Sequence, residues 1–117
     1  MSKIISCQSG INNMNHIGLQ NKYAKLFKKW FPRSFYYKIP DTAGLGGLRP
    51  GDSVLLVDSV VWLIEYKVPP DKMTKVQEFY KKKWLKAGGE FLLILSTDDP
   101  LVVFSRIKKI LQKREVI

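Results

Sequence analysis

The sequence is poor in sulfur and in imidazole, with Cys7 as its one cysteine and His16 as its one histidine among 117 residues. A single cysteine excludes an intramolecular disulfide and a zinc site built from several thiolates, and it favours a reducing compartment. No apolar run approaches the roughly 18 residues that cross a bilayer, and residues 1–15 lack the apolar stretch of a secretory signal. We therefore expect a cytoplasmic protein that is neither secreted nor inserted in a membrane.

Acidic residues are also scarce: ten Asp and Glu stand against twenty Lys and Arg, which gives a formal net charge of +10. Such a charge attracts polyanions, of which nucleic acid is the commonest. A solvated lysine-rich surface and a basic protein associated with the ribosome would have the same composition, so charge alone leaves both alternatives open.

The length suits one domain, and we expect residues 1–117 to form it, with residues 1–14 as a loosely structured lead-in. Hydrophobic periodicity and turn residues predict a helix over 15–31, strands over 35–39, 53–57 and 60–68, a helix over 72–87, a strand over 91–95 and a last helix from Pro100. The connection between the third and fourth strands is long enough for a parallel crossover. The sequence therefore predicts an α/β fold of order α-β-β-β-α-β-α, a mixed β-sheet flanked by helices.

Apolar stripes at helical spacing predict the buried faces of the helices. The stripe of the first helix consists of Ile17, Leu19, Tyr23, Ala24, Leu26, Phe27, Trp30 and Phe31. The stripe of the second consists of Met73, Val76, Tyr80, Trp84 and Ala87. In the predicted hairpin, a third apolar face either packs under the helices or forms an interface with a second copy of the chain; it consists of Trp62, Ile64 and Tyr66.

The predicted hairpin also brings charged side chains together. If Asp58 and Ser59 form its turn, residues whose numbers sum to 117 face each other, and Asp52 lies opposite Glu65. Cross-strand partners share a face with Cβ atoms roughly 4.5–5.5 Å apart, and Lys67 lies on that same face. A register shift of one residue would move these side chains to the other face.

Two carboxylates opposite each other repel, and a divalent cation removes that repulsion because carboxylate oxygens are natural ligands of Mg²⁺. Such a site could hydrolyse a phosphodiester, with Lys67 orienting water or stabilising the developing charge. Two alternatives remain open. In the first alternative, Glu65 and Lys67 are exposed edge residues without a role. In the second, Asp52 serves only the turn.

Asp52, a gap of twelve residues and then Glu65-Tyr66-Lys67 resemble the motif of the PD-(D/E)XK nuclease superfamily. The segment Lys38-Ile39-Pro40-Asp41-Thr42, with the glycine-rich loop after it, resembles a loop of archaeal Holliday-junction resolvases. Gln77 lies ten residues after Lys67 and precedes Trp84 and Ala87-Gly88-Gly89, an arrangement similar to the VRR-NUC branch. The resemblance covers about half the chain, residues 38–95, and implies a restriction-endonuclease-like fold.

The resemblance implies a magnesium-dependent endodeoxyribonuclease in which Mn²⁺ can substitute. Asp52, Glu65 and the backbone carbonyl of Tyr66 would bind the metal. Lys67 would be the catalytic lysine, and Gln77 would be an accessory polar group of the catalytic site.

The sequence departs from the family pattern at two places. Many members supply a further acidic metal ligand from the first helix, where this chain has Gln20, a poorer Mg²⁺ ligand. The motif's proline is displaced, because Gly51 separates Pro50 from Asp52. Both departures weigh against a two-metal mechanism more than against a one-metal mechanism, and they leave open an inactive nucleic-acid-binding protein with a nuclease-like fold.

The expected partner is DNA. Its contacts are expected at residues that flank the motif, namely Lys38, Thr42, Arg49 and Lys72. The resemblance implies branched DNA such as a Holliday junction or flap, a role in DNA recombination and repair, and a homodimer whose two sites make paired cuts. A compact nuclease of this kind suits a prokaryotic cell or a virus-infected host. We interpret His16 as a surface or capping residue. A basic adaptor on RNA or the ribosome is the more distant alternative.

Overall fold

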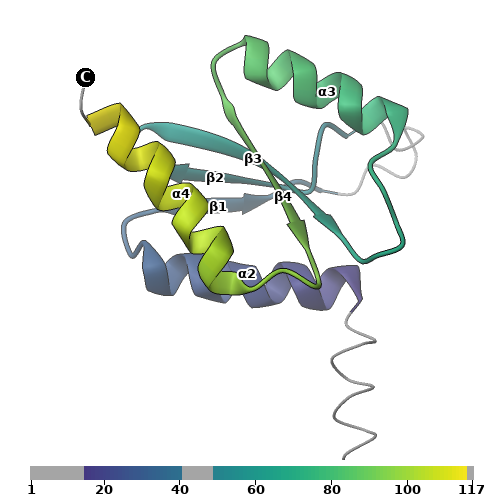
Figure 1. Cartoon of the computed structure of the whole chain (residues 1–117), viewed down its shortest axis with the longest axis horizontal. Coiled ribbons are helices and arrows are strands. Elements are labelled where there is room, and N and C mark those ends of the chain that lie inside the picture. The colour runs from purple at the N-terminus through teal and green to yellow at the C-terminus, as the bar shows by residue number, and fades with distance from the viewer. Residues whose placement is uncertain (1–14, 41–48, 116–117) are drawn as a thin grey trace, which may run out of the picture.

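The computed structural model describes residues 15–40 and 49–115, so the predicted lead-in lies outside the described residues. The elements within them are α2 (His16–Trp30), β1 (Phe35–Lys38), β2 (Ser53–Val57), β3 (Val60–Lys67), α3 (Lys75–Lys86), β4 (Glu90–Leu95) and α4 (Pro100–Glu115) (Figure 1). The fold class and the order α-β-β-β-α-β-α are confirmed. None of the helices in the described ranges is long and apolar enough to cross a membrane.

The four strands form one mixed sheet in the order β1-β2-β3-β4. Strands β1, β2 and β3 are antiparallel neighbours, and β4 returns parallel to β3 after the crossover through α3. The hairpin register pairs Val57 with Val60 and Ser53 with Ile64, as predicted. Asp58 and Ser59 both have positive φ, at 48° and 68°, which is the backbone of a type I′ turn. This turn fixes the register because its twist matches that of the two strands.

The core lies between one face of the sheet and the helices α2 and α4 (Figure 1). Trp62, Ile64 and Tyr66 are at most 1% exposed and belong to this core. Packing under the helices is therefore their role, and they cannot form an interface with a second copy. The prediction for Ile17 was wrong, since 57% of this residue is exposed. At 100° per residue, Ile17 points roughly 90° away from the centre of the stripe that is actually buried.

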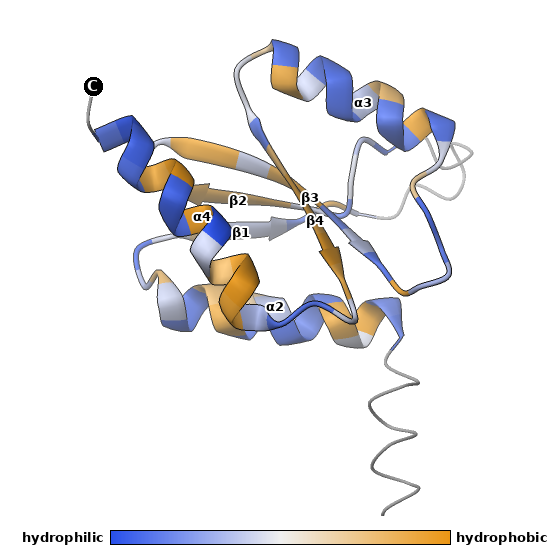
Figure 2. Ribbon diagram, viewed as in Figure 1, coloured by the Kyte–Doolittle hydropathy of each residue, from blue (hydrophilic) through white to orange (hydrophobic). Residues whose placement is uncertain are grey.

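Helix α3 lies over the opposite face of the sheet, where its main contacts are with β4 (Figure 1). The predicted buried stripe of this helix was wrong, because none of the residues of α3 is buried and Val76 is 40% exposed. Helices α2 and α4 bury each other through Phe104, which packs on Trp30 and Phe31. Among the described residues α3 has no such neighbour, and most of its own residues are hydrophilic (Figure 2). Its apolar positions therefore stay partly exposed.

Candidate active site

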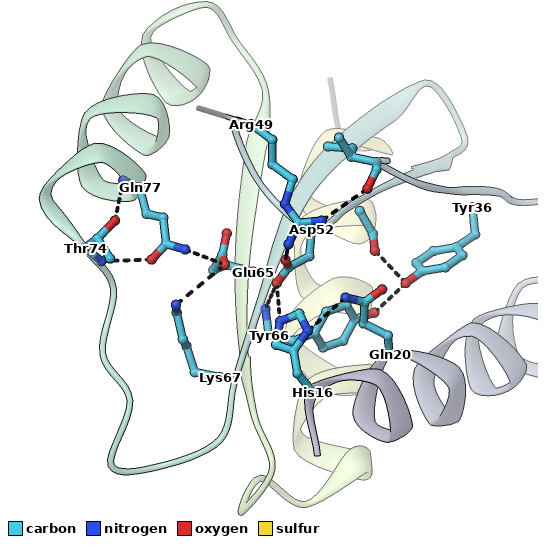
Figure 3. A network of polar contacts seen from close by, with 12 residues as sticks. His16, Gln20, Tyr36, Arg49, Asp52, Glu65, Tyr66, Lys67, Thr74 and Gln77 are labelled. Atoms are coloured by element: carbon cyan, nitrogen blue, oxygen red, sulfur yellow. Dashed lines mark hydrogen bonds and ion pairs between the residues drawn. The ribbon is translucent and has the colours of Figure 1, made fainter. Parts of the chain in front are cut away.

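Asp52 and Glu65 meet at the open end of the β2–β3 hairpin, where the predicted register places them (Figure 3). The two residues are almost fully buried, with 1% and 2% of their surface exposed. An oxygen of each carboxyl group and a ring nitrogen of His16 all lie within 4.8 Å of one another. Glu65 is therefore not an exposed edge residue, and Asp52 lies at the far end of the hairpin from the Asp58-Ser59 turn.

Three groups contact the Asp52 carboxylate. Its Oδ2 accepts a hydrogen bond from the backbone N–H of Tyr66 at 2.8 Å and lies 2.9 Å from Nε2 of His16. Its Oδ1 accepts a hydrogen bond from Nη2 of Arg49, also at 2.8 Å. Arg49 donates a second hydrogen bond to the carbonyl of Ile39 and so ties the segment after β1 to the site. The guanidinium is thus a built-in counter-ion of Asp52.

Gly51 lies in close contact with β3. A Cβ placed on Gly51 would lie 2.6 Å from Cδ1 of Leu63 and 3.3 Å from the carbonyl oxygen of Ile64. The backbone before Asp52 therefore packs so closely on β3 that a side chain fits only if Leu63 moves.

Glu65 has two partners of its own. Its Oε1 accepts a hydrogen bond from Nε2 of Gln77 at 2.9 Å and lies 3.8 Å from Nζ of Lys67. Gln77 is held in turn by a capping box, because its Oε1 accepts from the N–H of Thr74 while the Thr74 hydroxyl accepts from the N–H of Gln77. The start of α3 therefore fixes the amide that binds Glu65. The sequence does contain the signal for this capping box, Thr74-x-x-Gln77, but our prediction from the sequence did not use it.

The Glu65 carboxyl has an unusual proton affinity. Burial, and next the negative charge of Asp52, raise the pKa of Glu65 from 4.5 to about 8, although Lys67 and Arg49 act in the opposite direction. In the metal-free protein at neutral pH, the Glu65 carboxyl group therefore holds a proton. A divalent cation would replace that proton.

Next to the carboxyl pair in sequence, Ser53 and Tyr66 are joined through the half-buried Tyr36 in a row of three hydroxyl groups. The Tyr36 hydroxyl lies 2.6 Å from Oγ of Ser53 and 2.9 Å from the Tyr66 hydroxyl (Figure 3). Burial raises the pKa of Tyr36, so this hydroxyl stays neutral at ordinary pH. These hydrogen bonds hold Ser53 and Tyr66, the residues next to Asp52 and Glu65, in fixed positions.

The structure adds His16, which our sequence interpretation treated as a surface or capping residue. His16 is the first residue of α2 and reaches Asp52 across 36 positions of sequence. Gln20, predicted as a further metal ligand, binds His16 instead, with its Nε2 3.1 Å from Nδ1 of the imidazole. A usable signal existed, because His16, Gln20, Tyr23 and Phe27 recur at the spacing of one helix face.

The four predicted DNA contacts have different surroundings. Lys38 at the end of β1 and Lys72 before α3 are exposed, whereas Arg49 is paired with Asp52. Thr42 lies outside the described residues. Lys72 and Lys67 line the same cavity of about 460 Å³, whose apolar wall includes Leu93 and Leu95. The candidate catalytic lysine thus borders a recess whose lining includes neither Asp52 nor Glu65.

The donor set fits a divalent cation. Two carboxyl groups and an imidazole converge at distances that one ion could bridge, and each is a recognised ligand type. The backbone carbonyl of Tyr66 belongs to the peptide group between Tyr66 and Lys67, and its part in metal binding stays a prediction. No family model, no curated protein and no solved structure matches this chain.

Proposed function

We propose that the protein is a metal-dependent endodeoxyribonuclease of the PD-(D/E)XK superfamily, related to VRR-NUC domains and archaeal Holliday-junction resolvases. The observation that carries this proposal is the buried pair of Asp52 and Glu65 beside the ammonium of Lys67. Ionising both buried carboxyl groups is costly unless a cation compensates the second charge, and groups perturbed in this way concentrate at functional sites.

In this function the chain holds each group in a defined place. Asp52, Glu65 and the Tyr66 carbonyl would hold Mg²⁺ or Mn²⁺, which when bound neutralises phosphate charge and activates water at neutral pH. Lys67, only 14% exposed at its side chain, would offset the negative charge that develops on the scissile phosphate. The hydrogen bond from Gln77 keeps the Glu65 carboxyl turned toward the metal position.

The charge of the chain supports DNA as the substrate. A net charge of +10 favours binding to phosphate backbones, and Lys38 at the end of β1 and Lys72 before α3 are exposed. We propose branched DNA, a junction or flap, as the preferred form, and a homodimer as the active assembly; both come from the resemblance. The buried Trp62, Ile64 and Tyr66 are not part of its interface.

A second candidate function is a nucleic-acid-binding protein of nuclease-like fold that does not cut. The contact between Arg49 and Asp52 favours it, because the guanidinium already supplies a positive charge 2.8 Å from the carboxylate. In this function Arg49 would replace the metal permanently, and binding to DNA would depend on salt but not on divalent cations.

Cleavage of end-labelled DNA separates the two functions. A four-way junction, a flap, a plain duplex and a single strand would each be incubated with Mg²⁺, Mn²⁺ or EDTA. We expect wild-type protein to cut in Mg²⁺ or Mn²⁺ but not in EDTA, with branched DNA cut fastest, and the Asp52→Asn variant to bind DNA without cutting. Tight, salt-sensitive binding with no cutting in any metal would instead establish the second function.

A further inference from the structure

We propose that His16 is a direct protein ligand of the cation, that Gln20 positions it, and that this nitrogen ligand makes the site prefer first-row transition ions such as Mn²⁺ and Co²⁺ over Mg²⁺. The proposal rests on the proposed function as far as Asp52 and Glu65 bind a metal at all. It adds a third ligand from α2.

The position of His16 is fixed from two sides. Asn15 caps α2, since its side chain accepts a hydrogen bond from the N–H of Gly18 at 2.7 Å, and this cap sets where the first helical turn begins. The imidazole then meets the ring of buried Tyr66 edge-on, with the ring centroids 6.3 Å apart. Its Nε2 is aimed at Oδ2 of Asp52, within the group of ligand atoms that includes Glu65.

Gln20 provides an independent observation. The residue is only 3% exposed, and its Oε1 is buried without a hydrogen-bond partner among the described residues. In the present arrangement its Nε2 donates to Nδ1 of His16, so Nε2 of the imidazole carries the hydrogen and donates to Asp52. A buried amide oxygen beside an imidazole, but without a donor, calls for an explanation.

Rotation of the Gln20 amide supplies the explanation. If Oε1 and Nε2 exchange places, Oε1 accepts a hydrogen bond from Nδ1–H, and the lone pair of the imidazole Nε2 faces the carboxyl groups. Histidines that bind metals almost always donate their other N–H to an oxygen acceptor in this way. Gln20 is therefore a positioning residue, and His16, one turn earlier, occupies the role that family members give to an acidic residue of the first helix.

The ligand set then determines the choice of metal. Mg²⁺ prefers an all-oxygen octahedron and parts with its waters reluctantly. Imidazole favours transition ions, and affinity for mixed nitrogen and oxygen sites rises from Mn²⁺ to Co²⁺. A site of two carboxylates and one imidazole should consequently bind Co²⁺ more tightly than Mn²⁺, and both more tightly than Mg²⁺.

The test measures metal binding on the full-length protein without DNA. Calorimetry gives the affinities for Mg²⁺, Mn²⁺ and Co²⁺, and pulsed electron paramagnetic resonance of the Mn²⁺ complex detects a directly bound nitrogen. The variants are His16→Asp, which restores an all-oxygen set, Gln20→Leu, which removes the positioning amide, and Asp52→Asn, which removes the shared carboxylate. Ile17→Ala is the matched control, because its side chain is exposed next to His16.

We expect a nitrogen coupling in wild-type protein and in Ile17→Ala, and its loss in His16→Asp. The preference for Co²⁺ over Mg²⁺ should fall about tenfold or more in His16→Asp, and Gln20→Leu should lower the Co²⁺ affinity by about tenfold. Metal binding that requires Asp52 but shows no nitrogen coupling in wild type would overturn this proposal and leave the proposed function intact. The absence of any binding that depends on Asp52 would overturn both.

Discussion

The carboxylate of Asp52 accepts a hydrogen bond from the backbone N–H of Tyr66 at 2.8 Å, and Tyr66 lies between Glu65 and Lys67 in the sequence. This bond joins the start of β2 to the end of β3 at the site itself. It holds the Asp52 carboxylate against the backbone of the residue that follows Glu65. The geometry of the site is therefore tied to the backbone of the hairpin, and its consequences can be measured.

Arg49 competes with a metal for Asp52, because its guanidinium lies 2.8 Å from Oδ1. The Arg49→Gln variant should bind Mn²⁺ about tenfold more tightly than wild type. An adjacent positive charge stabilises an ionised carboxylate by a factor of about ten, and the metal no longer has to compete with it. Calorimetric titration of the DNA-free protein measures the change, with the exposed Arg33 changed to Gln as the control for lost charge. Weaker metal binding by Arg49→Gln would mean that the arginine supports the site and does not compete.

The metal-free protein should lose stability as the pH rises. The folded-state pKa of Glu65 is raised from 4.5 to about 8, so the folded chain holds a proton that the unfolded chain releases between these values. The contribution of Glu65 is fully present below about pH 4.5 and is lost by about pH 8, at a slope on the order of 1 kcal/mol per pH unit.

Urea denaturation of the metal-free protein at several pH values measures this slope, and Glu65→Gln, which cannot ionise, should flatten it. Saturating Mn²⁺ should reverse the trend, because the metal binds the ionised carboxylate. Equal slopes in wild type and Glu65→Gln would contradict the assignment of the raised pKa to this residue.

Gly51 should tolerate no side chain. The Gly51→Ala variant should lose about 1–3 kcal/mol of stability, because its Cβ would lie 2.6 Å from Cδ1 of Leu63. Truncation of the neighbour in the double variant Gly51→Ala/Leu63→Ala makes room for the new methyl group. Its loss of stability in urea should therefore be smaller than the sum of the two single losses. Additive losses would show that the two residues do not compete for space.

The sequence contained enough information for the carboxyl pair because the hairpin turn is local. Asp58 and Ser59 form a two-residue turn. Such a turn determines which residues face each other along the hairpin, and so it places Asp52 opposite Glu65. The fold class followed from the same kind of local pattern, since strands and helices of clear periodicity alternate along the chain.

What could not be predicted depends on contacts between distant segments. His16 reaches Asp52 only because α2 packs across the sheet, and its place on the buried helix face does not identify Asp52 as its partner. The exposure of α3 was missed for a related reason: the spacing of Val76, Tyr80 and Trp84 identifies an apolar side but not how much partner surface is available. The close approach of Gly51 to Leu63, twelve positions away, likewise leaves no sign in the local sequence.

The central claim is that Asp52, Glu65 and Lys67 form a catalytic centre, and single-turnover cleavage by Lys67→Met tests it most directly. DNA affinity would be measured on the same preparation in Ca²⁺, with Lys82→Met, on the exposed side of α3, as the matched control. We predict that Lys67→Met cuts its preferred DNA at least about 10²-fold more slowly than wild type, while its DNA affinity matches that of the control. Cleavage by Lys67→Met at the wild-type rate, or a loss no larger than the loss of binding, would contradict the account.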